Sequence, residues 1–444
     1  MAEIRPVRGL RYDPRAVGAL RDVVSPPYDV VDAIDQERLC ERSPFNIMRL
    51  LRWRPENGGG VNPYAEAAQE FMAWRHAGVL ARDEKPTIYI YDQDSGKVRR
   101  GFTGLIRLSD YDSGIVLPHE RTRPGPLEDR LNLMKAVHAN LSSIFGLFDD
   151  PRGRVSQILA NATGGRPCVE ISDYDGMTHR LWACQDPVTI EALTRAMSDR
   201  YVVIADGHHR YEAALRYREW RARLEGRVAM PSIPGHRSGG DSADRDDPDH
   251  ESTAHGLPGD RPYDYILMTF VPFDSEGTEI LPTHRVVGGL VPETAENVER
   301  RMSGRFRKMG EYRDLGEVLD SMAAAQGEGK IAIGIYMGSG RFTVSELTSQ
   351  SPAGSDAAVL DELVLGECLG IGPRDARRGE QVDFTHVPET AIREVDEGRR
   401  QLAFLLNPTP VTAVRDAALA GRIMPEKSTY FYPKLVAGLV INAF

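Results

Sequence analysis

The feature that most constrains the fold is an apolar run at residues 201–205, which ends at Asp206 and Gly207. Its sequence, Tyr-Val-Val-Ile-Ala, is β-branched and short, which is typical of a buried strand. Residues 211–224 then carry apolar side chains at helical spacing. The chain therefore predicts a strand–loop–helix corner. The start of a helix presents backbone N–H groups without helical partners, and such a corner suits an anion.

The rest of the chain alternates strands and helices, so we predict the α/β (α+β) class. With 444 residues, 41% of them hydrophobic, the chain is long enough for two or three domains with real cores. Periodicity and proline positions predict strands at 22–31, 87–91, 101–108, 265–271, 330–337 and 404–408, and helices at 62–78, 315–325 and 357–369.

Composition changes sharply at residues 228–262, which are rich in Pro, Gly, Ser and Asp. Six acidic residues lie between Asp241 and Glu251, which is typical of a disordered surface insertion. We therefore divide the chain into an N-terminal region (1–227), this insertion (228–262) and a C-terminal α/β region (263–444).

The formal net charge is −10, from 65 acidic against 55 basic residues. This negative net charge argues against a protein that coats nucleic acid, because such a protein needs a basic face. The four cysteines are far apart, which argues against a disulfide framework or a zinc ribbon. We find no signal peptide and no apolar stretch of about 18 residues, and we expect a cytoplasmic protein without a membrane partner.

The densest polar cluster is Asp206-Gly207-His208-His209-Arg210, which follows the predicted strand. Gly207 allows a sharp turn or a close approach to a ligand. Asp206 can accept from an amine or hydroxyl, and His208 or His209 can bind a phosphoryl oxygen or move protons near neutral pH. Arg210 offers a two-pronged donor for phosphate or carboxylate. The alternative is purely structural: Asp206 caps the helix, and the histidines form hydrogen bonds with the backbone.

Another cluster, Pro118 to Thr122, follows the apolar segment 115–117 and contains His119, Glu120 and Arg121. A desolvated Glu120 suits a general base, and a surface salt-bridge cluster is the alternative.

Two further segments carry residue types that bind phosphate. Residues 281–285 end in His284 and Arg285, and residues 424–434 contain Lys427, Ser428 and Lys434. An exposed turn would use the same residue types. No P-loop, G-x-G-x-x-G or kinase signature is present.

The segments 24–30 (Val-Ser-Pro-Pro-Tyr-Asp-Val), 118–122, 206–210 and 427–433 together resemble the bacterial and archaeal DUF1015 family. The corner at Asp206 is similar to that of the ParB/sulfiredoxin superfamily, which includes free-serine kinases. The resemblance implies a ParB/sulfiredoxin-like mixed-sheet core with an additional C-terminal α/β region that completes the site.

For function, the resemblance implies a phosphotransferase acting on free L-serine or a similar small hydroxyl metabolite, in either direction. Glu120 would activate the hydroxyl and Asp206 would hold the amine, while His208, His209 and Arg210 would bind the transferred phosphate. The phosphate partner would be ADP, ATP or pyrophosphate, with Mg²⁺ as a candidate ion.

Two other functions stay open at this point. One is a ParB-like nucleotide switch or DNA-associated regulator, although no helix-turn-helix with a basic recognition helix is evident. The other is a metal-dependent phosphoesterase with His119, His208, His209 and Asp206 as ligands. In the leading hypothesis the protein contains no structural metal, uses a small-molecule substrate and is compatible with a homodimer. We expect catalysis by Glu120, Asp206 and His209, and binding by His119, Arg121, Gly207, His208, Arg210, His284, Arg285, Lys427, Ser428 and Lys434.

Overall fold

The computed structural model describes residues 2–52, 62–226, 260–349, 355–372 and 378–444. These residues form two compact units. The first unit contains Met1–Leu117, Thr122–Gly277 and Lys434–Phe444. The second contains Pro118–Arg121 and Thr278–Pro433.

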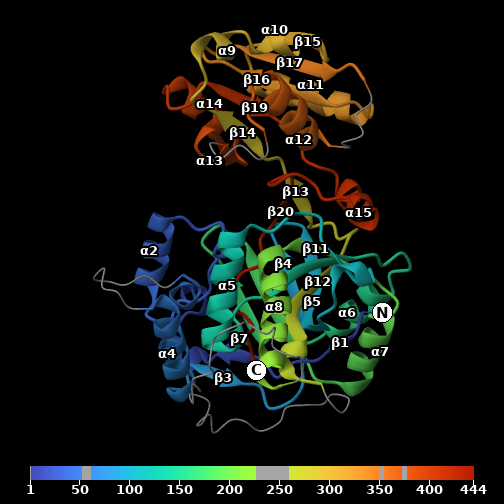
Figure 1. Ribbon diagram of the computed structural model, residues 1–444. Coiled ribbons are helices and arrows are strands. Elements are labelled where there is room, and N and C mark those ends of the chain that lie inside the picture. The colour runs from blue at the N-terminus through green and yellow to red at the C-terminus, as the bar shows by residue number, and fades with distance from the viewer. Residues whose placement is uncertain (1, 53–61, 227–259, 350–354, 373–377) are drawn as a thin grey trace. The chain divides into compact units, whose positions relative to one another are not determined.

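A large mixed sheet forms the centre of the first unit (Figure 1). Its order within the described chain is β6-β11-β8-β12-β5-β4-β10-β9, with β1 beside β5. The pairs β6·β11 and β8·β12 are parallel and the others are antiparallel. The strands are β1 (Ile4–Arg5), β4 (Ile88–Asp94), β5 (Val98–Arg107), β6 (Val116–Leu117), β8 (Ile144–Phe148), β9 (Val169–Ser172), β10 (Thr178–Cys184), β11 (Val202–Asp206) and β12 (Tyr265–Pro272).

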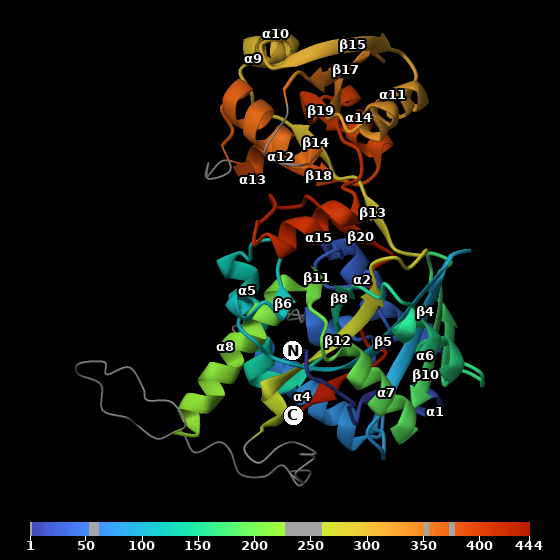
Figure 2. The same cartoon turned by 90° about the vertical axis from the view of Figure 1, so that its right-hand side faces the viewer.

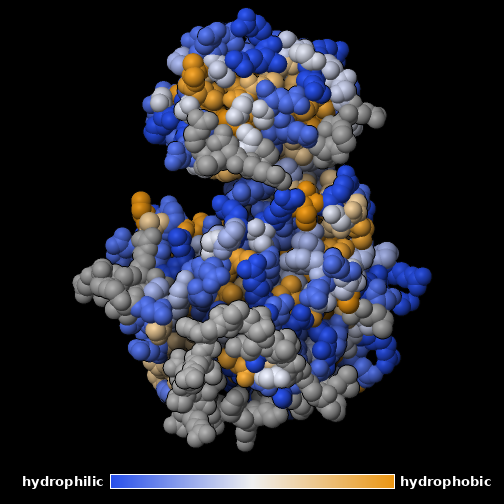
Figure 3. Space-filling model, in the orientation of Figure 1, coloured by the Kyte–Doolittle hydropathy of each residue, from blue (hydrophilic) through white to orange (hydrophobic). Residues whose placement is uncertain are grey.

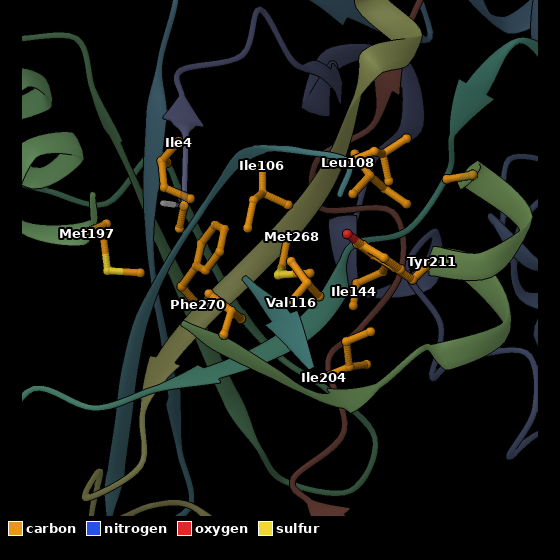
Figure 4. Close-up of a cluster of buried hydrophobic side chains, with 14 of the residues drawn as sticks. Ile4, Ile106, Leu108, Val116, Ile144, Met197, Ile204, Tyr211, Met268 and Phe270 are labelled. Atoms are coloured by element: carbon orange, nitrogen blue, oxygen red, sulfur yellow. The ribbon is translucent and has the colours of Figure 1, made fainter. Parts of the chain in front are cut away.

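Helices α5 (Pro124–Val137) and α8 (His208–Leu224) lie side by side in this unit (Figure 1). Alternate residues of β12, among them Met268 and Phe270, point into the main core (Figure 4). There they lie with Ile106 of β5, Ile204 of β11 and Tyr211 of α8. Burial of each such side chain contributes roughly 1.5–3 kcal/mol. The core thus fixes the end of β11 against the start of α8.

The remaining elements surround this sheet. Helices α6 (Arg154–Ala162) and α7 (Pro187–Met197) contact each other, and α6 packs on β5 (Figure 2). A second apolar cluster joins the N-terminal helices to the C-terminal tail. The other elements are α1 (Pro14–Val17), α2 (Ala33–Arg42), α3 (Met48–Leu51), α4 (Pro63–His76), and the strand pairs β2 (Leu10–Tyr12) with β3 (Leu80–Arg82) and β7 (Ala139–Asn140) with β21 (Asn442–Ala443).

An antiparallel sheet of order β15-β17-β16-β19-β14-β18 forms the second unit, with a separate pair β13·β20. Apolar clusters cover both faces of this sheet. The strands are β13 (Glu279–Leu281), β14 (His284–Val287), β15 (Phe306–Tyr312), β16 (Ala332–Tyr336), β17 (Phe342–Leu347), β18 (Val382–Thr385), β19 (Leu402–Leu405) and β20 (Tyr430–Tyr432). The helices are α9 (Pro292–Glu296), α10 (Val298–Met302), α11 (Leu315–Gly327), α12 (Asp356–Val359), the π-helix Leu360–Cys368, α13 (Arg378–Gln381), α14 (Pro388–Asp396) and α15 (Val411–Leu419).

The α/β class is confirmed, as are the predicted hairpin (β4·β5), helix α4, strands β11, β12, β16 and β19, and helix α11. The predicted strand at 22–31 is wrong. A 3-10 turn (Leu20–Asp22) is followed there by a loop with one isolated bridge at Ser25, because Pro26 and Pro27 have no N–H for a ladder. The helix predicted at 357–369 is split into α12 and the π-helix.

The predicted three-part division stays a prediction, since residues 227–259 lie outside the described residues. Residues 260–262, assigned to the insertion, are ordered, and Asp260 pairs with Arg5 and Arg107. Strand β12, which we assigned to the C-terminal region, belongs to the first unit because it pairs with β5 and β8.

Hydrophilic residues cover most of the described surface in the view of Figure 3, and apolar residues form small groups. Among the described helices, none combines the length and apolar character needed to cross a membrane.

Candidate functional site

The strand–helix corner is present at the predicted position. Strand β11 ends at Asp206, Gly207 follows with φ of 97°, and α8 begins at His208. The left-handed backbone at Gly207 favours glycine, because in other residues the Cβ would come too close to the following carbonyl oxygen. In the described chain no side chain caps this end of α8, so its first N–H groups point toward the corner.

Asp206 is the centre of a buried ion cluster. Its Oδ1 lies 2.5 Å from Lys434 Nζ, and its Oδ2 lies 2.6 Å from Arg210 Nη2. Burial by itself would raise the pKa of this carboxyl. Lys434 and Arg210 reverse that effect and hold the pKa of Asp206 well below its usual range. Asp206 is therefore a carboxylate at any physiological pH.

Arg210 is held in place by more than its ion pair. Its Nη1 donates to the Ser142 hydroxyl (3.0 Å) and to the Ser143 carbonyl (2.6 Å). A Cβ on Gly207 would lie 2.9 Å from Arg210 Nε, so the guanidinium packs directly against the glycine. Arg210, Ser142 and Arg130 also line a pocket that encloses about 390 Å³ of space, part of it open to solvent.

Tyr28 and Arg130 belong to this site although we did not predict them as site residues. The Arg130 guanidinium lies 3.9 Å from the centre of the Tyr28 ring. Burial raises the pKa of Tyr28 to about 12, and the charges of Arg130 and Arg210 oppose that rise. Tyr28 is therefore a neutral phenol with a proton to donate. Its position in the 24–30 motif was a signal that could have placed it in the site.

The loop that carries Tyr28 is tied to the chain's last segment. Ser25 exchanges backbone hydrogen bonds with Ala437, at 3.3 and 2.8 Å, and its hydroxyl donates to Asn46 Oδ1 at 2.7 Å. Ala437 lies three positions after Lys434. Segments from both ends of the sequence thus meet the corner of β11 and α8.

The two histidines of the corner differ in their surroundings. His208 is buried, and its charge would lower the pKa of Asp206. His209 Nε2 accepts a hydrogen bond of 2.9 Å from the backbone N–H of Arg123, directly before α5. This contact occupies the lone pair that a general base would use. The catalytic role of His209 stays a prediction.

The residues 118–121 belong to the second unit, where they meet the 424–431 segment. The Met424 N–H donates to the His119 carbonyl (2.8 Å), and Glu120 forms a parallel bridge with Met424. His119 is buried, with Nε2 at 2.8 Å from Thr429 Oγ1. Glu120 is half-buried and Arg121 is exposed.

His284 and Arg285 lie inside the second unit, on β14. Both side chains are fully buried. His284 Nδ1 accepts from the Leu406 N–H at 3.1 Å, and burial lowers the pKa of His284 to about 4. Arg285 lies 3.6 Å from Asp361 and donates to the Thr283 carbonyl. Neither side chain has exposed surface for a small anion, so the phosphate-binding role predicted for both is wrong.

Lys427 and Ser428 lie in a turn of the second unit. Lys427 has a φ of 57°, and the Ser428 hydroxyl donates to the Pro425 carbonyl at 2.7 Å. Thr409 donates to the Ser428 carbonyl at 2.8 Å. Ser428 thus stabilises the turn, and its phosphate-binding role stays a prediction.

The described residues contain no cluster of three or more His, Cys, Asp or Glu side chains that could hold a metal ion. Asp206, His208 and His209, three of the ligands expected for a phosphoesterase, do not form such a cluster, and the fourth, His119, belongs to the second unit. Asp206 has both oxygens occupied by cations. The described side chains alone do not fit a Mg²⁺ cage.

The corner carries more positive than negative charge. One carboxylate (Asp206) faces two cations (Lys434 and Arg210), and the N-terminus of α8 adds the positive end of its dipole. Such an arrangement favours an anion at the corner. Fold and site together define an α/β protein with a positively charged corner at the start of α8.

The chain belongs to the DUF1015 family, described as a protein of unknown function, whose model matches residues 4–363. The 427–433 motif lies beyond the matched range. A comparison with curated proteins finds no match.

The solved structures that match the chain share little sequence with it. A free serine kinase in complex with AMP has 12% identity and a TM-score of 0.34, covering 74% of this chain and 86% of its own. SbnI with a C-terminal truncation, from Staphylococcus aureus, has 11% identity and a TM-score of 0.35, covering 76% and 86%. A conserved hypothetical protein from Pyrococcus furiosus has 12% identity and a TM-score of 0.34, covering 74% and 91%.

Proposed function

We propose that this protein is a phosphotransferase that moves a phosphoryl group to or from the hydroxyl of a small metabolite, with free L-serine as the acceptor and ADP, ATP or pyrophosphate as the phosphate partner. The observation that carries the proposal is the ion cluster of Asp206, Lys434 and Arg210 at the start of α8. The resemblance of the 24–30, 118–122, 206–210 and 427–433 motifs supports the choice of serine. The ParB/sulfiredoxin-like core is part of the same proposal.

Phosphoryl transfer depends mainly on positioning and on neutralising charge. Lys434 and Arg210 would neutralise the oxygens of the phosphoryl group, and the first amides of α8 would donate to them. Asp206 holds both cations, and an ionised carboxylate has further lone pairs that could accept from the serine amine. Tyr28 would contribute a neutral donor from the neighbouring loop.

Glu120 is our proposed general base, which would take the proton of the serine hydroxyl. It lies on the second unit, and its role rests on the motif resemblance alone. His208 is proposed to bind the phosphate. A Mg²⁺ ion, if recruited by the substrate phosphates, would supply charge neutralisation, and no step here depends on it.

The test is phosphoserine formation by the full chain incubated with L-serine and, in turn, ADP, ATP and pyrophosphate. We expect wild type to produce phosphoserine with at least one of them. Asp206→Asn should lower kcat/KM at least 100-fold, because it removes the charge that orients two cations. Glu120→Gln should lower kcat while leaving nucleotide affinity unchanged.

Asp175→Asn is the matched control, because Asp175 lies in an exposed turn of the same unit. It should keep wild-type activity. Thermal unfolding of each variant checks that it is folded. Absence of phosphoserine with all three partners, or full activity of a folded Asp206→Asn variant, contradicts the proposal.

A further inference from the structure

The pocket beside Arg210 extends from the corner into the first unit and encloses about 390 Å³ of space, part of it open to solvent. Most of its wall is apolar and is made of Leu51, Leu133, Met134, Ala139, Leu141 and Ile266. Its described polar lining is Arg130, Asn140, Ser142 and Arg210. A group that enters this pocket meets few polar partners, and these partners determine its chemistry.

Asn140, on β7, is a buried side chain of this lining whose hydrogen bonds are incomplete. It is 4% exposed. Its Oδ1 accepts from the Leu267 N–H at 3.2 Å and from Asn442 Nδ2 at 3.0 Å. A backbone N–H can only donate, so the contact with Leu267 fixes which end of the amide is the oxygen. The Nδ2 group has no hydrogen-bond partner among the described residues, although a buried donor normally has one.

The two arginines of the lining differ from Asn140 in that each has a carboxylate partner. Arg130 pairs with Asp129, and Arg210 pairs with Asp206. Unmatched charge is therefore not what marks this pocket. The Nε–H of Arg210, however, is buried and meets no acceptor in the described part of the chain. Both incomplete groups are donors, so the partner that they require is a hydrogen-bond acceptor.

The acceptor substrate of the proposed reaction has such a group. Free L-serine carries an amine, a hydroxyl and a carboxylate. The amine is assigned to Asp206 and the hydroxyl receives the phosphoryl group, which leaves the carboxylate without a partner. A carboxylate has acceptor atoms only. Because Arg210 contacts Asp206 and also lines the pocket, the pocket adjoins the place of the amine.

We propose that Asn140 determines substrate specificity, and that its Nδ2 group binds the carboxylate of an amino-acid substrate together with Arg210 Nε. This inference rests on the proposed function, because it concerns the acceptor of that reaction. The apolar wall around Asn140 keeps water away and so strengthens hydrogen bonds to a charged acceptor. The protein would therefore select amino acids over amino alcohols that lack a carboxylate.

The experiment titrates the full chain by calorimetry with L-serine and with ethanolamine, which keeps the amine and the hydroxyl but has no carboxylate. Wild type should bind L-serine at least tenfold more tightly, a difference of about 1.4 kcal/mol. Asn140→Asp keeps the oxygen that accepts from Leu267 and replaces the donor with an acceptor. It should weaken L-serine binding at least tenfold, about 1.4 kcal/mol, and leave ethanolamine binding unchanged.

Asn161→Asp is the matched control, because it makes the same substitution at an exposed position of α6 and should change neither affinity. Asn140→Leu is a second variant, which removes the donor without adding a charge. It should lose the preference for L-serine as well. Thermal unfolding checks that each variant is folded.

Equal affinity of wild type for L-serine and ethanolamine overturns the proposal without the use of any variant. Folded Asn140 variants that bind L-serine as wild type does also overturn it, and a buried water is then the only partner of Nδ2.

The phosphoserine assay separates this inference from the proposed function. Phosphoserine formation by wild type, together with unchanged L-serine affinity in Asn140→Asp, overturns the role of Asn140 and leaves the transferase standing. L-serine binding that depends on Asn140, without phosphoserine from any of the three phosphate partners, contradicts the transferase and supports the carboxylate site.

Discussion

Asp206 is a buried carboxylate between two cations, and such a cluster is weak evidence for stability because burying charges costs desolvation. Its place beside a left-handed glycine at a helix start fits the proposed ligand-binding role. The sequence correctly predicted that the polar residues 206–210 lie where a strand ends and a helix begins. It could not indicate that Lys434, 228 positions away, contacts Asp206, because that contact depends on how the tail folds back.

His209 allows a test at the residue scale. Its Nε2 accepts from the Arg123 N–H, so His209→Ala should lower the free energy of unfolding by about 1 kcal/mol. His209→Gln offers a side-chain acceptor and should recover part of that loss. Urea unfolding and phosphoserine formation are measured on both variants. Unchanged stability in His209→Ala with lost turnover would instead assign the residue to catalysis.

At the scale of elements, the corner was predictable because the apolar run of β11 ends sharply at Asp206 and Gly207, and α8 starts within three residues of the predicted position. Loops were less predictable. The segment 22–31 reads as a strand by composition, but its prolines lack donors and its partner, Ala437, lies at the other end of the chain. His284 and Arg285 followed a pattern similar to the corner, yet they lie on β14, between β18 and β19.

Substitution of Gly207 tests whether the corner requires the left-handed backbone at this position. In Gly207→Ala the added Cβ would meet Arg210 Nε and Nη2 at 2.9 Å. Gly176→Ala is the control, because Gly176 also has a positive φ (83°) but no atoms within 4 Å. Both variants should lose about 1–2 kcal/mol from backbone strain. Gly207→Ala should lose more and should also weaken nucleotide binding. Equal losses in both, with unchanged nucleotide affinity, would contradict this role of Gly207.

Asp356, at the start of α12, predicts an unusual pH dependence in the second unit. Burial raises the pKa of Asp356 to about 6, although Asn407 donates to it at 3.1 Å. The folded state therefore binds its proton more tightly than the unfolded state. The charged carboxyl destabilises the fold above pH 6, and this destabilisation disappears as the pH falls toward 4.

Asp356→Asn should then be more stable than wild type at pH 7, by up to about 3 kcal/mol, and equal to it below pH 4. Urea unfolding at several pH values measures the difference. Comparing the two proteins at each pH cancels the contribution of His284, whose lowered pKa makes stability fall as the pH drops through about 4. If Asp356→Asn is less stable than wild type at pH 7, the charged Asp356 stabilises the fold, and the prediction is wrong.

At the scale of the whole molecule, composition and patterning gave the α/β class and argued for real cores, and both were confirmed. The division into units was harder to derive from the sequence, because the chain passes between them at Leu117–Pro118, Arg121–Thr122, Gly277–Thr278 and Pro433–Lys434. The order of residues in the sequence does not indicate where the chain passes from one unit to the other. The motifs behind the family resemblance consequently fall into two groups: 24–30 and 206–210 lie in the first unit, and 427–433 lies in the second with all of 118–122 except Thr122.

The central claim is that the corner of β11 and α8 binds the phosphate of a small ligand. Hydrogen–deuterium exchange of the full chain, with and without ADP and L-serine, tests it most directly. We predict slower exchange in peptides covering 206–211 and 434–437 when ligand is present, and no such slowing in Asp206→Asn. Unchanged exchange in both peptides at saturating ligand would contradict the account.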